Sequence, residues 1–185
     1  MKKNGFTLIE LVVVIVILGI LAVVAAPKFM NLQNDARNAS LKGLEGSLNS
    51  ALGITYSKLT IMGLENNVYV TTQAKWENAG PGIYGVKIPL PGCNKSPWCT
   101  FRYGYPDAHR NTLKNLISNF NQDWAIAYNE SNGEYNITFK QFVKPYNDKN
   151  GHFRWNVLTK NNCYISYAPP ISATSGYTLK LIKCS

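Results

Sequence analysis

The sequence predicts an α+β protein in which one long N-terminal helix packs on an antiparallel β-sheet. Two patterns predict the helix: an apolar run from Phe6 to Ala26, followed by apolar residues at helical spacing across residues 28–59. A third pattern, alternation of apolar and polar residues after Asp123, predicts the strands. A helix and a sheet that are each apolar on one side can bury those sides against each other. The length of 185 residues suits one such domain plus an anchor.

The run from Phe6 to Ala26 contains 21 residues and a single charge, on Glu10. A helix of that length would span about 32 Å, enough to cross a hydrocarbon core of roughly 30 Å. Lys2 and Lys3 are expected to remain cytoplasmic, which would place the rest of the chain in the periplasm or outside the cell.

Two simpler interpretations leave Glu10 unexplained. A signal peptide cut near Ala25 or Ala26 would have a shorter apolar region, of about 7–15 residues. A plain membrane anchor would have no use for an acidic side chain, which costs about 2.5–3.5 kcal/mol at the bilayer centre and less near its surface. Glu10 is therefore a candidate functional residue that requires a partner.

An amphipathic helix is expected over residues 28–59. Its apolar side would carry Phe29, Leu32, Ala36, Leu41, Leu44, Leu48, Ala51 and Leu52. Its solvent-exposed side would carry Lys28, Asp35, Arg37, Lys42 and Glu45. Gly19 and Pro27 interrupt the preceding apolar half, so a kink or local melting is expected between residues 22 and 27.

The remainder divides into a loop-rich region, residues 60–123, and a strand-rich region, residues 124–185. The first is expected to hold short strands at 68–72 and 84–88 and a helix at 107–120. The second is expected to hold strands at 124–128, 135–143, 154–158, 164–167 and 177–182, with a turn at 130–133 between the first two.

The four cysteines are Cys93, Cys99, Cys163 and Cys184, and their spacing does not match a zinc site. An even number of cysteines after an export-type segment predicts two disulfides formed in an oxidising compartment. Three connectivities are open from the spacing alone.

No catalytic, metal or cofactor site is expected. His109 and His152 have no nucleophile or acid at an informative spacing, and the segment Asp148-Lys149-Asn150-Gly151 lacks the closing glutamate of a calcium loop. The formal charge of +9 would suit nucleic acid, but no Lys/Arg run is longer than two residues, so nucleic-acid binding has no support beyond net charge.

The segment Gly5-Phe6-Thr7-Leu8-Ile9-Glu10 and the apolar run after it resemble the start of type IV pilins and pseudopilins. This resemblance implies a prepilin leader at residues 1–5, cleavage after Gly5 by a prepilin peptidase, and N-methylation of Phe6. Residues 6–27 would be the membrane and filament-core helix, and residues 28–185 the globular domain of a type IV pilin fold. Glu10 would pair with the amino group of Phe6 in a neighbouring subunit, and the stretch from Gly19 to Pro27 would loosen within the filament.

A narrower resemblance, to the mannose-sensitive haemagglutinin pilins, rests on short blocks: residues 27–37, Tyr103-Gly104-Tyr105-Pro106-Asp107-Ala108, Asp123-Trp124 and Asn162-Cys163-Tyr164. It implies the major subunit of an adhesive surface pilus, built by a pilus assembly machinery from inner-membrane precursors and attaching to host or abiotic surfaces. Related pilins fasten a C-terminal loop with a disulfide, which favours pairing Cys163 with Cys184 and Cys93 with Cys99.

Three other functions compete with this interpretation. The major pseudopilin of a type II secretion system would share the N-terminal helix, but such subunits rely on calcium rather than on a C-terminal disulfide. A DNA-uptake pilin would depend on the charge after cleavage, 9 − 2 = +7. An anchored periplasmic enzyme would need a catalytic site, and the sequence offers none.

Overall fold

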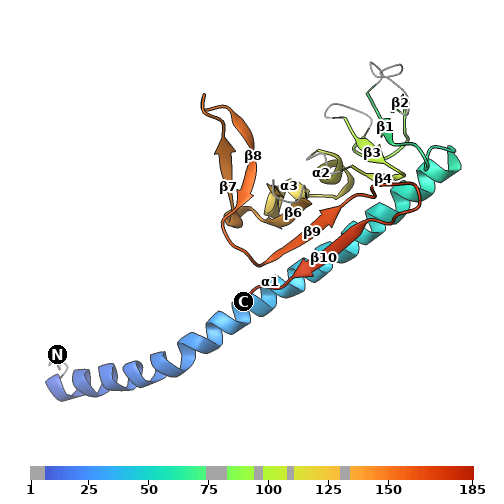
Figure 1. Cartoon of the computed structure of the whole chain (residues 1–185). Helices are drawn as coiled ribbons and strands as arrows, with labels where there is room; N and C mark the ends of the chain where they lie inside the picture. Colours follow the sequence, from blue (N-terminus) through green and yellow to red (C-terminus); the bar gives the residue numbers. More distant parts are fainter. Residues whose placement is uncertain (1–6, 74–82, 94–97, 108–110, 130–133) are drawn as a thin grey trace, which may run out of the picture.

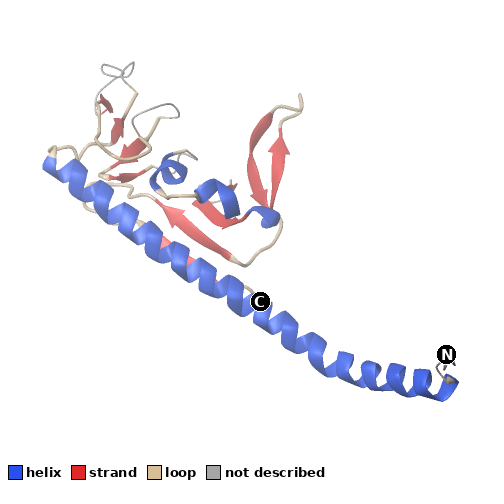
Figure 2. Cartoon of the chain, turned by 180° about the vertical axis from the view of Figure 1, so that it is seen from behind, coloured by secondary structure: helices blue, strands red, loops and turns tan. Residues whose placement is uncertain are grey.

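The computed structural model describes residues 7–73, 83–93, 98–107, 111–129 and 134–185. Helix α1, Leu8–Ile61, has 54 residues and is therefore about 80 Å long. Its first half extends away from the rest of the molecule, and its second half lies along the sheets (Figures 1 and 2). The α+β class predicted from the sequence is confirmed.

Both ends of α1 are capped by local sequence. At the start, Thr7 and Glu10 form a capping box. At the end, Gly63 adopts φ +67°, and the amides of Gly63 and Leu64 donate to the carbonyls of Thr60 and Leu59 at 3.0 and 2.9 Å. This is a Schellman motif, which needs a residue that tolerates the left-handed conformation, and glycine does so most readily.

The larger sheet has the order β10-β9-β6-β5-β8-β7. Its strands are β5 Trp124–Asn129, β6 Glu134–Phe139, β7 Val143–Asn147, β8 Phe153–Leu158, β9 Tyr164–Ala168 and β10 Thr178–Ile182. Most pairs are antiparallel, but β8 runs parallel to β5 through one registered pair, Ala127 with Asn156. The β7–β8 hairpin therefore projects from the body of the sheet (Figure 1).

The main core forms where α1 crosses this sheet. Leu41, Leu44, Leu48 and Leu52 of the helix are buried against sheet residues that include Ile126, Ile137, Ile165 and Tyr167. At the start of the predicted apolar side, Phe29 and Leu32 are not buried and are 69% and 59% exposed. The sheet does not extend far enough to cover them. The buried side also continues further than predicted, through Thr55 and Leu59.

A smaller sheet of order β2-β1-β3-β4 lies near the C-terminal end of α1. Its strands are β1 Tyr69–Thr71, β2 Ile83–Gly85, β3 Thr100–Arg102 and β4 Tyr105–Pro106. A second apolar cluster fills the space between it and the helix end: Leu59, Val70, Ile88, Leu90, Cys93, Cys99 and Phe101.

Several predicted boundaries were wrong. The helix predicted at 107–120 is replaced by two short helices, α2 Thr112–Leu116 and α3 Phe120–Asp123. The strand predicted at 135–143 ends at Phe139, because a 3₁₀ turn at Lys140–Phe142 intervenes and Val143 opens the next strand. The predicted turn at 130–133 lies outside the described residues.

Candidate functional site

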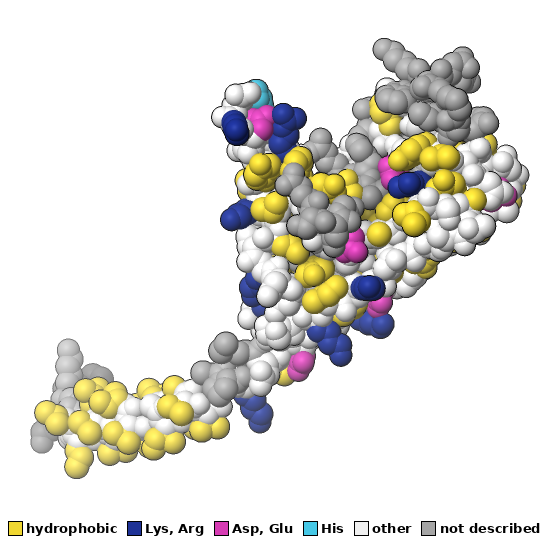
Figure 3. Space-filling view, in the orientation of Figure 1, with side chains coloured by type: hydrophobic (Ala, Val, Ile, Leu, Met, Phe, Trp, Pro, Cys, Tyr) yellow, Lys and Arg dark blue, Asp and Glu magenta, His cyan; other side chains and the backbone are white. Residues whose placement is uncertain are grey.

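The most unusual surface of the molecule is the exposed first half of α1. The segment Leu8–Ala25 has a mean hydropathy of 3.2 and is long and apolar enough to cross a membrane, judged by length and composition. Its large side chains are exposed, from 43% at Val12 to 80% at Leu8, and Figure 3 shows hydrophobic side chains along the length of this part of the helix. Monomeric soluble proteins rarely expose so extensive an apolar patch. We therefore expect lipid or other protein chains to shield this segment from water.

Glu10 is held at the start of this segment by Thr7. The Glu10 carboxylate accepts hydrogen bonds from the Thr7 amide at 2.8 Å and from its hydroxyl at 2.6 Å. In return the Glu10 amide donates to the Thr7 hydroxyl oxygen at 3.4 Å. A carboxylate in the first turn also interacts favourably with the helix dipole. The single charge of the apolar segment thus has local partners within one chain.

Gly5 and Phe6, the predicted processing residues, lie outside the described residues. Glu10 is therefore placed by the structure, while its predicted contact with the amino group of a neighbouring Phe6 stays a prediction. Such a contact would replace the hydrogen bonds that Thr7 donates to the Glu10 carboxylate. Thr7 lies two residues after Gly5, the predicted cleavage point.

Gly19 and Pro27 both lie within the unbroken helix α1. Nothing lies within 4 Å of the point where a Cβ on Gly19 would stand. Proline has no amide hydrogen, so the helix lacks one backbone hydrogen bond at Pro27. Figure 1 shows α1 gently curved in a single chain, and the predicted loosening within a filament stays a prediction.

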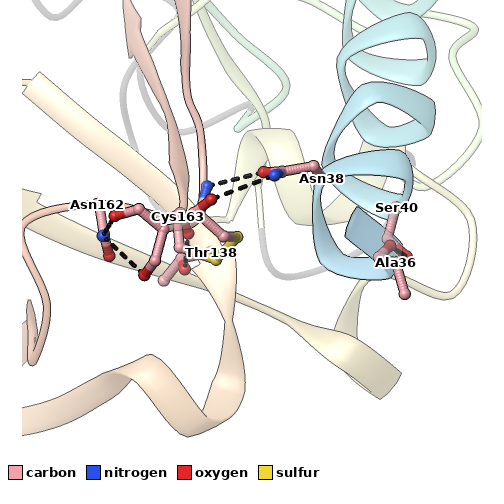
Figure 4. Close-up of a disulfide and its surroundings, with 8 residues drawn as sticks. Ala36, Asn38, Ser40, Thr138, Asn162 and Cys163 are labelled. Atoms are coloured by element: carbon pink, nitrogen blue, oxygen red, sulfur yellow. Dashed lines mark hydrogen bonds between the residues drawn. A yellow bond between two sulfur atoms is a disulfide. The ribbon is translucent and has the colours of Figure 1, made fainter. Parts of the chain in front are cut away.

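The C-terminal end of the chain is fastened both to itself and to α1. Cys163 is bonded to Cys184, the pairing favoured from the sequence. Asn38 of α1 donates from Nδ2 to the carbonyl of Cys184 at 3.2 Å, and its Oδ1 accepts from the Cys184 amide at 2.7 Å (Figure 4). Thr138 donates from Oγ1 to the carbonyl of Cys163 at 2.6 Å. Hydrogen bonds therefore hold one cysteine of the disulfide to helix α1 and the other to strand β6.

Sequence reasoning missed the role of Asn38. It lies 146 residues from Cys184 and has no neighbouring motif. An asparagine on a helix is ordinarily a solvated residue, and no sequence signal could have found this contact.

The second disulfide joins Cys93 to Cys99, and both cysteines are buried in the second apolar cluster, next to the smaller sheet. Gly92 precedes it with φ +81°, and a Cβ on Gly92 would lie 2.1 Å from the carbonyl oxygen of Asn115. Only glycine fits at this position. The residues between the two cysteines, 94–97, lie outside the described residues.

Asp148 belongs to a hairpin turn. Its Oδ1 accepts from the amides of Asn150 and His152, each at 2.9 Å, and its Oδ2 forms a 2.7 Å ion pair with Arg154. Within the described part of the chain, no group of three or more His, Cys, Asp and Glu side chains could hold a metal ion. His109 lies outside the described residues.

Residues 1–26 match the prokaryotic N-terminal methylation motif. The chain is also 44% identical over 54 residues to the type IV narrow pilus major component PilA5 of Thermus thermophilus. That alignment covers 29% of this chain and 47% of the relative, so the chain spans about half the length of the curated relative it matches. No solved structure significantly matches the chain.

The matched motif covers Gly5, Phe6 and Glu10, together with most of the exposed apolar helix. The architecture, a long N-terminal apolar helix followed by a sheet rich in antiparallel pairs, is type IV pilin-like. The motif match concerns residues 1–26 only, and the alignment to the relative covers 29% of the chain.

Proposed function

We propose that this chain is a type IV pilin: a structural subunit processed after Gly5, N-methylated on Phe6 and polymerised through α1 into a surface filament. The exposed apolar segment Leu8–Ala25 carries the proposal. Such a segment is stable in lipid before assembly, and in a filament the same segments of neighbouring subunits would cover one another. The matched methylation motif, at the same residues, supports this interpretation.

In this proposal Glu10 sets the position of each subunit along the filament. Two opposite charges that are costly apart in an apolar core become tolerable as a hydrogen-bonded pair. Glu10 would therefore exchange its hydrogen bonds from Thr7 for the charged amine of a neighbouring Phe6. Methylation leaves that amine charged, so the pairing would survive the modification.

We further propose that the subunit is a major pilin of the mannose-sensitive haemagglutinin type. Its precursor would lie in the inner membrane, and the pilus assembly machinery would build it into an extracellular pilus that attaches to host or abiotic surfaces. The Cys163–Cys184 disulfide supports an extracellular location, because disulfides persist in oxidising compartments and stabilise the fold by constraining the unfolded chain.

The bond between Cys163 and Cys184 favours a pilin over a type II secretion pseudopilin. A pseudopilin would be stabilised by calcium, whereas Asp148 already has hydrogen bonds and an ion pair with Arg154. Calcium is therefore expected to leave the thermal stability of the globular domain unchanged, and a marked rise in its Tm with calcium would favour the pseudopilin.

The proposed processing is tested by co-expressing the full chain with a prepilin peptidase and measuring the intact mass. The product should lack residues 1–5 and carry one added methyl group on Phe6. A Gly5→Glu variant should stay uncut, which controls for non-specific proteolysis. A product beginning near Pro27 would instead identify an ordinary signal peptide.

A further inference from the structure

Positive charge is concentrated in one segment of the globular domain, residues 140–160, named the basic hairpin below. It comprises the 3₁₀ turn, strands β7 and β8, and the two residues after β8. The segment contains five Lys and Arg residues and one acidic residue, so its net charge is +4 within 21 residues. Its four lysines are all exposed: Lys140, Lys144, Lys149 and Lys160. Figure 3 shows Lys and Arg side chains on the projecting hairpin.

The charges of these lysines are not neutralised by neighbouring acidic side chains. Within the described part of the chain, none of the four lysines forms an ion pair. The single carboxylate of the segment, Asp148, accepts hydrogen bonds from two turn amides and pairs with Arg154. It therefore compensates the charge of Arg154 rather than that of a lysine. The basic hairpin presents a net positive field to its surroundings.

The base of the basic hairpin contacts α1 where the helix leaves the body of the domain. Phe142 is 7% exposed, and the guanidinium of Arg37 and the ammonium of Lys160 lie 5.1 and 4.5 Å from the centre of its ring. These cation–π contacts hold both cations in place. Arg37 lies 12 residues after Ala25, the last residue of the apolar segment, which is about 18 Å along the helix. Arg37 thus extends the positive surface toward the anchor.

The basic hairpin also lies at the end of the body nearer the apolar half of α1. Figures 1 and 2 show the β7–β8 hairpin at this end and the smaller sheet at the opposite end, beside the C-terminal end of the helix. Because the body lies on one side of α1, a tilt of the helix toward that side, ordinarily about 20° in a membrane, would bring the hairpin closer to the lipid surface. The hydrogen bond missing at Pro27 makes bending easier there.

Exposed aromatic rings accompany the positive charges. Tyr146 is 45% exposed and Phe153 is 51% exposed, although both belong to strands of the hairpin. Tyr146 is held by stacking on Trp155, with ring centroids 5.1 Å apart. Aromatic rings and basic side chains together favour the interface between membrane and water, where the rings enter the headgroup layer and the cations contact phosphates.

We propose that the basic hairpin binds the anionic phospholipid surface of the membrane that anchors the subunit. The inference rests on the part of the proposed function in which the segment Leu8–Ala25 spans the membrane before assembly. The lysines would contact lipid phosphates, and the rings of Tyr146 and Phe153 would enter the headgroup layer. Nucleic acid would also suit the charge, but the exposed rings and the position beside the anchor favour lipid. The subunit would lean against the membrane until it is extracted into a filament.

The test uses the ¹⁵N-labelled full chain in lipid nanodiscs that hold either one chain or several, with a gadolinium chelate on a small fraction of the lipid headgroups. One set of discs is phosphatidylcholine, and the other contains about 30% phosphatidylglycerol. NMR measures how much the gadolinium accelerates the relaxation of each backbone amide. The effect at Lys149 and Gly151 should be at least about threefold larger in the anionic discs. This difference should vanish in about 0.5 M NaCl, where the Debye length is about 4 Å.

Two reference amides accompany the hairpin signals. Val24, near the end of the apolar segment, should respond to gadolinium equally in both kinds of disc, because it lies at the membrane boundary in each. Val70, in strand β1 of the smaller sheet, should respond in neither, because it lies at the opposite end of the body.

Two double variants remove the same charge from opposite ends of the domain. Lys144→Gln/Lys149→Gln changes the hairpin, and Lys58→Gln/Lys87→Gln changes the end of α1 and the chain beside the smaller sheet. A basic residue near an anionic surface contributes about fivefold in binding, so the hairpin variant should lower the ratio of docked to undocked chains about 25-fold. The other variant should leave it within about twofold. Both should keep the wild-type Tm, because none of these lysines forms an ion pair in the described part of the chain.

Four results would overturn the inference. The first two are an equal gadolinium effect at the hairpin in neutral and anionic discs, and an equal loss of docking in the two double variants. The third is an effect confined to discs that hold several chains, which would assign the hairpin to contacts between subunits. The fourth is a response of the hairpin amides to duplex DNA and not to phosphatidylglycerol, which would assign the surface to nucleic acid.

The Val24 amide separates this inference from the proposed function. If Val24 responds in every disc and the hairpin in none, the lipid contact is refuted and the pilin proposal stands. If Val24 does not respond either, α1 is not inserted, and both proposals fail together.

Discussion

Replacing both cysteines of the Cys163–Cys184 disulfide with alanine should destabilise the globular domain more than the same replacement at Cys93–Cys99. The two bridges are a natural matched pair, since all four cysteines are less than a tenth exposed and each lies within an apolar cluster. The packing lost with the sulfur atoms is therefore similar. What differs is the length of chain that each bridge closes, with sequence separations of 21 and 6.

The chain-entropy model converts these lengths into free energies of unfolding. A bridge over 21 residues contributes about 3 kcal/mol, and one over 6 residues contributes about 2 kcal/mol. The Cys163→Ala/Cys184→Ala variant should therefore lose about 1 kcal/mol more than the Cys93→Ala/Cys99→Ala variant. The Asn38 hydrogen bonds to Cys184 should keep the C-terminal strand docked in the folded variant, so the loss would come mainly from the freer unfolded chain.

The assay is urea unfolding of the oxidised full chain in detergent micelles, followed by near-ultraviolet circular dichroism. Each variant should unfold in one transition with an unchanged slope, so that the shift in midpoint measures stability. Wild-type protein treated with a reductant should approach the stability of a variant lacking both bridges. An equal or larger loss for the Cys93–Cys99 pair would refute the loop-length argument and assign the stabilisation to local packing instead.

Three further variants test separate parts of the structure. Glu10→Val should be cleaved normally but give few filaments, as judged by sheared-fibre yield, and a normal yield would remove the assembly role of Glu10. Asn38→Leu should lower the free energy of unfolding by about 1–3 kcal/mol, because it leaves the Cys184 amide and carbonyl unpaired; an unchanged urea midpoint would contradict this. Burial raises the pKa of Tyr167 well above its ordinary value, and its hydroxyl donates to the Pro106 carbonyl at 2.6 Å. Above about pH 10 the unfolded chain alone releases this proton, so stability should fall with rising pH, and the fall should be smaller in Tyr167→Phe.

The sequence predicted the long helix well because its signals are local. The spacing of Leu41, Leu44, Leu48 and Leu52 indicates both the helix and its buried side. The same periodicity does not indicate where the covering sheet ends, and so Phe29 and Leu32 follow the apolar spacing although they are exposed. Periodicity predicts an element, whereas burial depends on what packs against it.

The errors among the strands have local causes of a different kind. Strand β7 carries Pro145, which disfavours a strand prediction and is tolerated here because β7 lies at the sheet edge. Strands β3 and β4 are two or three residues long and are joined through Tyr103 and Gly104, both with positive φ. Alternation cannot be recognised in segments that short.

Some candidate functional residues can be identified from a local sequence motif, and others only from tertiary contacts. Gly5, Phe6 and Glu10 form a contiguous motif and could be identified from the sequence. Asn38 acquires its role from a contact 146 residues away. That role could be recognised only in the tertiary structure.

Electron microscopy of sheared surface fibres, combined with mass spectrometry of their subunit, would show whether this chain polymerises through its N-terminal helix. We expect fibres made of this chain, with each subunit beginning at methylated Phe6 and with the segment Leu8–Ala25 packed along the fibre axis. Fibres that lack this chain, or a mature chain that begins near Pro27 and forms no fibre, would contradict it.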